Sequence, residues 1–349
     1  MTLEDPDTRR FALDDPRGFL AELTNGAILD EIQRAPKLTS NLQGLVDADP
    51  RPGRFVLTGS QQFELMRGLT QSLAGRTAVL RLLPLTASEV VCLRPGAAKH
   101  DLPEWLRTGF HLRIHDRGLE PSQAMADYFA TYVERNLREL TAVHDLRRFK
   151  RFERFVRFCA GRVGQLLNLT SLGNDAGVSQ TTAQAWIDLL ETSYIVHLLP
   201  PWFTNTSKRL IKSPRLHFYD VGQACWLLGL RTAAQVGRDP LWDSLFENFI
   251  IIEAIKDRFH QGDNMPVYFY CDATGNEVDL LLPAGGSYRA LEIKAGATVN
   301  PDYLRGLARF KRAHARQLES AGVVYGGARN QRRSDRPVWS WRTLLKRPA

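Results

Sequence analysis

The stretch Ala27-Ile28-Leu29-Asp30-Glu31-Ile32-Gln33 decides the fold of the N-terminal region. Its short apolar run ends in two adjacent carboxylates, and Gly26 and Pro36 on either side are typical of element boundaries. Such a run predicts a buried strand of a parallel sheet with both acids at its C-terminal edge, where open α/β sheets bind their ligands. Taken alone, the pattern favours an ordinary strand followed by a solvated Asp-Glu turn.

The neighbouring segments strengthen the prediction of a parallel sheet. A second apolar run at 54–61 predicts another strand, and between the two runs lies a helix-length segment, 36–47, with leucines on one face. A strand, a helix and a strand in so few residues imply a right-handed crossover and parallel pairing. We expect a third strand at 77–82 and then a helix with Thr86 as its N-cap.

Three segments resemble, in order and spacing, the bacterial AAA-type ATPases that carry a C-terminal domain of unknown function. They are Leu29-Asp30-Glu31-Ile32-Gln33-Arg34-Ala35-Pro36, Phe55-Val56-Leu57-Thr58-Gly59-Ser60-Gln61 and Ser72-Leu73-Ala74-Gly75-Arg76. The resemblance implies that Asp30 and Glu31 are the catalytic Walker B pair, which orients Mg²⁺ and polarises the attacking water. It also implies that Ser60 or Gln61 senses the γ-phosphate and that Arg76 lies near the nucleotide.

The chain departs from that family at the phosphate-binding loop. No Gly-x-x-x-x-Gly-Lys-Ser/Thr motif occurs in the 349 residues. Because that loop and its lysine supply most of the binding energy for phosphates, tight ATP binding is not expected, and Mg²⁺ is the remaining candidate cofactor. The sequence thus resembles an N-terminally truncated member; a misplaced start, a split gene and a degenerate ATPase all fit. A sheet without its first strand exposes an edge that a protein partner could cover.

Composition narrows the classes of partner and compartment. The formal net charge is +8, and the pI of about 9.4 permits DNA as a partner without requiring it. No run of about 18 apolar residues predicts a membrane span, and the acidic N-terminus does not resemble a signal peptide. Four scattered cysteines indicate neither a zinc site nor a disulfide framework, so we expect a cytoplasmic protein. The sequence contains no pattern that indicates an oligomeric state.

The fold class we expect is α/β, with four regions along the chain. They are an ATPase remnant at 1–95, a helical linker at 96–145, a winged-helix-like region at 146–213 and a restriction-endonuclease-like domain at 214–349. The linker includes a long helix over 121–141. The basic tail beyond Gly326 is expected to be partly disordered.

The winged-helix prediction rests on a helix at 146–163, a short helix from Leu169, a glycine turn, a helix at 180–193 and a strand. In DNA-binding versions, the second helix of the motif places its N-terminal residues on base edges. The candidate DNA contacts are Arg151, Arg154, Gln180, Thr181, Lys208 and Arg209. A core helix with a solvated basic face explains the 146–163 segment more simply, and the same fold also serves as a protein-interaction module.

The sharpest chemical pattern lies on two strands joined by a glycine turn, 277–282 and 289–294. Period-two alternation puts Glu292 and Lys294 on one face, and hairpin pairing can bring Asp279 beside Glu292. Asp279 and Glu292 could hold Mg²⁺ while Lys294 acts on a water. Glu247, or less favourably Glu253, on a helix at 241–258 could complete the metal shell.

This layout resembles the core of the restriction-endonuclease-like nucleases, an Asp followed by Glu-x-Lys. A solvated trio in which Glu292 and Lys294 simply pair with neighbours explains the pattern without a metal. Acids and a lysine on otherwise apolar strands favour a functional site, although this fold often persists after catalysis is lost. The sequence therefore leaves an active nuclease, a relic and a non-catalytic interaction module open.

Overall fold

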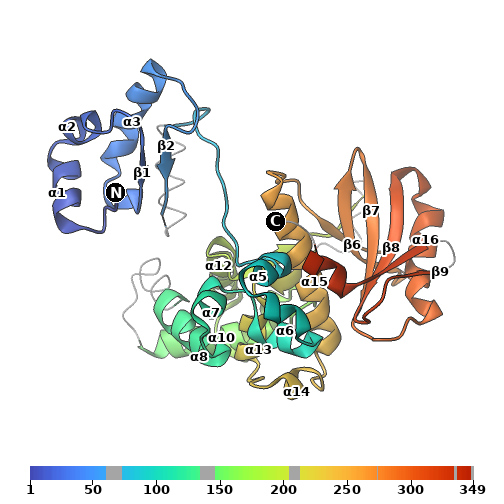
Figure 1. Cartoon of the computed structure of the whole chain (residues 1–349). Coiled ribbons are helices and arrows are strands. Elements are labelled where there is room, and N and C mark those ends of the chain that lie inside the picture. Colours follow the sequence, from blue (N-terminus) through green and yellow to red (C-terminus); the bar gives the residue numbers. More distant parts are fainter. Residues whose placement is uncertain (60–72, 134–145, 204–212, 273, 334–335, 347–349) are drawn as a thin grey trace. The chain divides into compact units, whose positions relative to one another are not determined.

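The computed structural model describes residues 1–59, 73–133, 146–203, 213–272, 274–333 and 336–346, and the chain divides into two compact units (Figure 1). The first unit is Met1–Leu80 and the second is Arg81–Ala349. Each unit is described by itself. Both mix helices with sheet, which confirms the expected α/β class.

In the first unit, three helices cover one face of a two-stranded parallel sheet. The elements are α1 (Pro6–Asp14), α2 (Pro16–Ala21), β1 (Ala27–Leu29), the 3-10 helix η1 (Ile32–Arg34), α3 (Lys37–Ala48) and β2 (Phe55–Leu57). Leu29 is fully buried in a cluster with Phe19 and Leu38, whereas Ile28, facing the other way, is exposed. The predicted strand, helix and parallel strand are therefore confirmed.

The other edge of β1 is paired at one end by the first residues of the chain. The Met1 ammonium donates to the Ile28 carbonyl at 2.8 Å, and the Leu3 N–H donates to the Asp30 carbonyl at 3.0 Å. By contrast, the predicted strand at 77–82 is wrong, because these residues form no helix or strand. Leu80 and Leu82 are 81% and 96% exposed, so this apolar run is not buried against a sheet among the described residues.

The second unit begins with short helices. They are α5 (Ala87–Leu93), the 3-10 helix η2 (Pro95–Lys99), α6 (Leu102–Thr108), α7 (Leu112–Arg117), α8 (Pro121–Tyr128) and the π-helix η3 (Phe129–Val133). The predicted N-cap is confirmed, because Thr86 and Glu89 form a reciprocal capping box. The expected long helix over 121–141 is α-helical only to Tyr128, and its last part lies outside the described residues.

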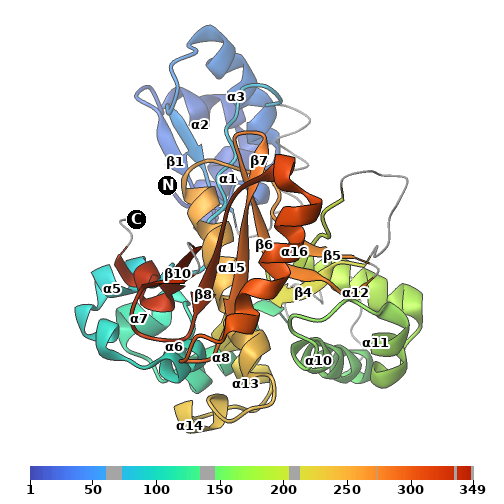
Figure 2. The same ribbon diagram turned by 90° about the vertical axis from the view of Figure 1, so that its right-hand side faces the viewer.

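Three helices and a two-stranded antiparallel hairpin follow. They are α10 (Leu146–Ala160), α11 (Leu169–Ala176), α12 (Gln180–Thr192), β3 (Val196–Leu199) and β4 (Arg215–Phe218). Figure 2 shows α10, α11 and α12 grouped together. Phe152 and Phe155 of α10 contact the Trp186 ring of α12 edge-on, with centroids 5.3 and 5.2 Å apart. The apolar stripe of α10 is therefore core, as the simpler explanation proposed.

The C-terminal part is a six-stranded mixed sheet with α15 on one face and α16 on the other (Figures 1 and 2). Its helices are α13 (Val221–Leu227), α14 (Ala233–Val236), α15 (Trp242–His260) and α16 (Arg305–Ala313), with the short 3-10 helices η4 (Pro301–Leu304), η5 (Ala315–Gln317) and η6 (Trp341–Lys346). Its strands are β5 (Tyr268–Cys271), β6 (Glu277–Ala284), β7 (Ser287–Lys294), β8 (Leu318–Tyr325), β9 (Gln331–Arg333) and β10 (Arg336–Ser340), in the order β5-β6-β7-β8-β10-β9. The β7–β8 and β8–β10 pairs are parallel.

The described residues beyond Gly326, 327–333 and 336–346, are structured, although the sequence predicted that part of this basic tail is disordered. Strand β10 pairs in parallel with β8, a long-range partner that local composition cannot reveal. The Trp341 side chain is 2% exposed, and the Ser340 hydroxyl donates to the Gly327 carbonyl at 2.6 Å. Burial of this tryptophan outweighs the local excess of arginine.

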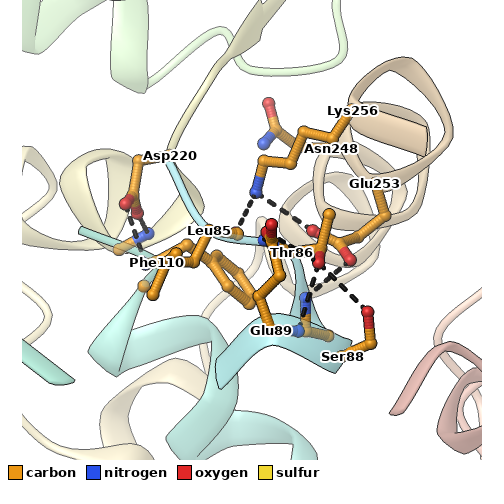
Figure 3. Close-up of polar contacts among 12 residues, drawn as sticks. Leu85, Thr86, Ser88, Glu89, Phe110, Asp220, Asn248, Glu253 and Lys256 are labelled. Atoms are coloured by element: carbon orange, nitrogen blue, oxygen red, sulfur yellow. Dashed lines mark hydrogen bonds and ion pairs between the residues drawn. The ribbon is translucent and has the colours of Figure 1, made fainter. Parts of the chain in front are cut away.

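A buried ion pair on α15 anchors the first segment of the second unit (Figure 3). The Lys256 ammonium donates to Glu253 at 3.0 Å and to the Leu85 carbonyl at 2.8 Å, and it lies 4.3 Å from the Phe110 ring centroid. The second Glu253 oxygen accepts the Ala87 N–H at 2.8 Å. Glu253 is therefore committed to this anchor and not to the metal shell considered for it.

Within the described parts of the chain, no helix has the length and apolar character needed to cross a membrane.

Candidate functional site

Asp279, Glu292 and Lys294 converge where β6 pairs with β7. The Lys294 ammonium lies 3.0 Å from an Asp279 oxygen and 2.8 Å from a Glu292 oxygen. The Ile293 N–H also donates to Asp279 at 2.7 Å. The pairing of β6 with β5 shifts register around Asp279, a bulge of the kind that re-aims a side chain. The structure therefore brings the predicted trio together.

Two further acids and an arginine extend this site, and we name the whole set the acid–lysine cluster. Its members are Arg215, Glu247, Glu277, Asp279, Glu292 and Lys294. The Arg215 guanidinium bonds Glu247 at 3.1 Å and Glu277 at 3.0 Å, and it lies 3.9 Å from Asp279. Sequence reasoning had found Glu247 but missed Arg215 and Glu277. For Arg215, the available sequence signal was a charged residue at the start of an otherwise apolar strand.

Burial and mutual repulsion perturb the acids of the cluster. Burial, and next the Asp279 charge, raise the pKa of Glu247 to about 8 and that of Glu292 to about 7. Burial alone would lower the pKa of Lys294, but Asp279 and Glu292 outweigh it and hold that pKa above its usual range. Four carboxyls face two cations here, so full ionisation would leave two excess negative charges.

The donor set fits a hard divalent cation such as Mg²⁺ in its chemistry, because carboxylate oxygens are the ligands that this ion prefers. Glu292 is 8% exposed, and its second oxygen has no hydrogen-bond partner within the described part of the chain. The same described residues, however, contain no ready set of three His, Cys, Asp or Glu ligands. Lys294 lies between Asp279 and Glu292 and takes up an oxygen of each.

In the first unit, Asp30 follows β1 at the C-terminal edge of the small sheet. Its carboxylate accepts the Thr58 hydroxyl at 2.5 Å, and hydrogen bonds from Thr58 and then Thr2 lower its pKa. Glu31 has a left-handed backbone, with φ of 56°, and accepts from the Gln33 amide at 2.5 Å. The predicted sensors Ser60 and Gln61 lie outside the described residues.

Arg76 is placed away from this acid pair. Its guanidinium bonds Asp47 at 2.5 Å, near the C-terminal end of α3. Helix α3 starts just after the Asp30 turn and leads back to the start of β2. Its C-terminal end therefore lies at the opposite end of the strands from Asp30. The structure thus does not bring Arg76 to Asp30.

The candidate DNA contacts lie on two helices of one bundle. Arg151 and Arg154 are exposed on α10, and the Arg154 guanidinium lies over the Phe158 ring at 5.3 Å. Gln180 and Thr181 are exposed in the first turn of α12, where Gln180 accepts from the Thr170 hydroxyl at 3.2 Å. Lys208 and Arg209 lie outside the described residues.

Comparison with known proteins places this chain in a family. A model described as an AAA domain matches residues 1–91, and two domains of unknown function, DUF8612 and DUF4143, match 99–234 and 242–344. The chain therefore belongs to an AAA-type ATPase family with a C-terminal DUF4143 domain. Uncharacterized proteins of Mycobacterium bovis and Mycobacterium tuberculosis are each 31% identical over 327 residues, covering 92% of this chain and 69% of theirs. No solved structure matches.

Proposed function

We propose that this chain is a DNA-associated member of the AAA-type ATPase family whose C-terminal domain has a restriction-endonuclease-like fold and cleaves phosphodiesters with Mg²⁺. One observation carries the proposal: Asp279, Glu292 and Lys294 approach one another from adjacent strands, with the lysine within 3.0 Å of both acids. Glu247, joined to Asp279 through Arg215, supplies a fourth group from the flanking helix.

The roles of these residues follow from their charges. Asp279 and Glu292 would hold the metal, with Glu247 completing its shell, and the bound metal would polarise a phosphoryl oxygen and acidify a water. Lys294 stays protonated at neutral pH because its pKa is raised. It therefore donates hydrogen bonds and positive charge to a water or a phosphate, and it does not remove a proton.

The α10–α12 bundle would supply DNA binding as a winged helix. Exposed Arg151 and Arg154 suit phosphates, whereas Gln180 and Thr181 at the start of α12 suit base edges. Binding to a long duplex should fall steeply with salt. Arg151→Ala and Arg154→Ala should weaken it uniformly, while Gln180→Ala should change sequence preference. Salt-insensitive or absent binding would favour a protein-interaction module.

For the first unit, we propose weak nucleotide binding, since the phosphate-binding loop is absent from this sequence. Asp30, held by Thr58, would orient Mg²⁺ at the sheet edge. Calorimetric titration with Mg-ATP tests this proposal. A micromolar dissociation constant that is lost in Asp30→Ala would contradict it.

Plasmid cleavage with Mg²⁺ or Mn²⁺ tests the nuclease proposal. Asp279→Ala and Lys294→Ala should each abolish cleavage, whereas Arg289→Gln, on the same strand but paired with the exposed Glu319, should leave it intact. Cleavage that survives both cluster substitutions would come from another source. No cleavage by the wild-type chain would favour a relic.

A non-catalytic interaction module remains the second candidate. It is favoured by the cations already present in the cluster, because Lys294 and Arg215 contact Asp279 without any metal. In that case, partner binding should be insensitive to removal of divalent ions by a chelator. A metal-dependent nuclease should instead lose its activity in the chelator and regain it with Mn²⁺.

A further inference from the structure

Arg215 reaches the acid–lysine cluster from a different part of the chain than the acids do. It lies on β4, in the hairpin beside the α10–α12 bundle, whereas the four acids lie on α15, β6 and β7. The residue is 7% exposed, which is rare for an arginine unless it is paired. Its segment also falls in the DUF8612 match, and the acids fall in the DUF4143 match.

We propose that Arg215 is the internal counter-ion of the cluster and that a divalent cation binds there in competition with its guanidinium. The inference rests on the metal site of the proposed function and adds a control on how that site is loaded. The two terminal nitrogens of the Arg215 side chain bond different acids, Glu247 at 3.1 Å and Glu277 at 3.0 Å. The guanidinium thereby bridges α15 and β6, as a divalent ion between carboxylates would.

The position of the guanidinium is fixed on several sides. It lies over the Phe269 ring, 4.7 Å from the centroid. The Arg215 backbone pairs with Leu199 on β3 and bridges to Leu166. Moving the guanidinium away from the acids therefore requires either a new side-chain conformation or a shift of the β3–β4 hairpin, which links metal loading to the winged-helix region.

The charge argument gives the direction and size of the effect. Removing one positive charge near Asp279 leaves the cluster more negative and frees the Glu247 and Glu277 oxygens that Arg215 now bonds. A divalent ion gains from each additional negative charge within about 5 Å, by about tenfold in affinity where water screens the interaction. Arg215→Gln should therefore bind Mn²⁺ about tenfold more tightly than the wild-type chain.

The experiment is calorimetric titration of the full chain with Mn²⁺ alone at pH 7.5. Arg215→Gln should bind about tenfold more tightly, and Arg215→Lys two- to fivefold more tightly because an ammonium cannot bridge both acids. Arg289→Gln, which removes an arginine from the exposed pair with Glu319, should bind like the wild-type chain. Circular dichroism and urea unfolding establish which variants are folded.

The outcomes separate this inference from the proposed function. If Asp279→Asn binds Mn²⁺ as the wild-type chain does, no metal binds at the cluster, and both the proposed function and the competition fail. If Asp279→Asn loses binding but Arg215→Gln binds equally or more weakly than wild type, the metal site stands and the competition is wrong. Should Arg215→Gln not fold, Arg215→Lys decides alone, with equal or weaker affinity overturning the inference.

Discussion

Two buried glutamate–lysine pairs in the second unit differ in how completely their polar atoms are used. In the Glu253–Lys256 pair, both carboxylate oxygens are bonded, and the ammonium bonds a carbonyl and faces an aromatic ring (Figure 3). In the Glu292–Lys294 pair, one Glu292 oxygen has no partner within the described residues. The first pair is closed on itself, and the second belongs to a cluster with more acids than cations.

This difference distinguishes a pair whose polar groups are all bonded from a cluster that keeps free acceptor capacity among the described residues. A buried ion pair is stable only when further hydrogen bonds satisfy both partners, and Glu253–Lys256 meets that condition with backbone groups of 85–87. Nothing remains on it for a ligand to use. The acid–lysine cluster has unused acceptor capacity and raised carboxyl pKa values, which a divalent cation would relieve.

The largest expected effect on the free energy of unfolding comes from breaking the Glu253–Lys256 pair. Lys256→Met leaves the Glu253 carboxylate buried, with only 5% exposure, and without its cation. Breaking such a pair from one side should lower the free energy of unfolding by about 3–5 kcal/mol. Urea denaturation followed by circular dichroism measures the loss.

The double variant Glu253→Gln/Lys256→Met is the matched control. It removes both charges while keeping an acceptor for the Ala87 N–H, so it should be more stable than Lys256→Met alone. A double variant that is as unstable as the sum of the two single variants would show that the two charges do not interact.

A smaller loss is expected from the equivalent change in the open cluster. Lys294 is one-third exposed, at 33%, and the Glu292 carboxyl, with its pKa near 7, can take up a proton when the lysine is removed. Lys294→Met should therefore cost about 1–2 kcal/mol at pH 7.5. It should cost less at pH 5.5, where the Glu292 carboxyl is protonated because its pKa is raised to about 7. A loss as large as that of Lys256→Met would mean that the two pairs are equivalent.

The pH dependence of stability sharpens the same contrast. The pKa of Glu247 is raised from 4.5 to about 8, so the folded chain holds a proton that the unfolded chain releases. Stability contributed by this group therefore falls as the pH rises between about 4.5 and 8. Glu247→Gln removes the titration, so the variant should gain stability relative to wild type as the pH rises from 5 to 8, by at most about 1.4 kcal/mol per pH unit. A stability difference that is constant across this range would contradict the raised pKa.

The sequence predicted the cluster residues whose placement follows from local patterns. Period-two alternation placed Glu292 and Lys294 on one face, and the helix pattern placed Glu247 beside the sheet. Arg215 and Glu277 were missed because their contacts join segments more than 30 residues apart and depend on how the β3–β4 hairpin meets β6. The bulge that aims Asp279 is likewise set by pairing with β5 and not by local composition.

The fold shows the same limit of local patterns. Hydrophobic periodicity found β1, β2 and α12, whose partners follow closely in the chain. It failed at 77–82, where an apolar run pairs with no strand among the described residues, and local composition did not reveal strands β9 and β10 beyond Gly326. Beyond Gly326, pairing with the distant strand β8 decided the structure, whereas Leu80 and Leu82 in the first region stay exposed.

The smallest expected effect concerns an exposed pair on the strand that carries Glu292 and Lys294. Arg289 bonds Glu319 on the adjacent strand at 2.9 Å, but both side chains are largely in water, at 58% and 42% exposure. Screening and side-chain entropy cancel most of the attraction in such pairs, so Arg289→Gln should change the free energy of unfolding by less than about 0.5 kcal/mol. The change should shrink further in 1 M NaCl. A loss above 1 kcal/mol in urea denaturation would show that burial does not set the order of these three pairs, and that the contrast between the closed pair and the open cluster needs another cause.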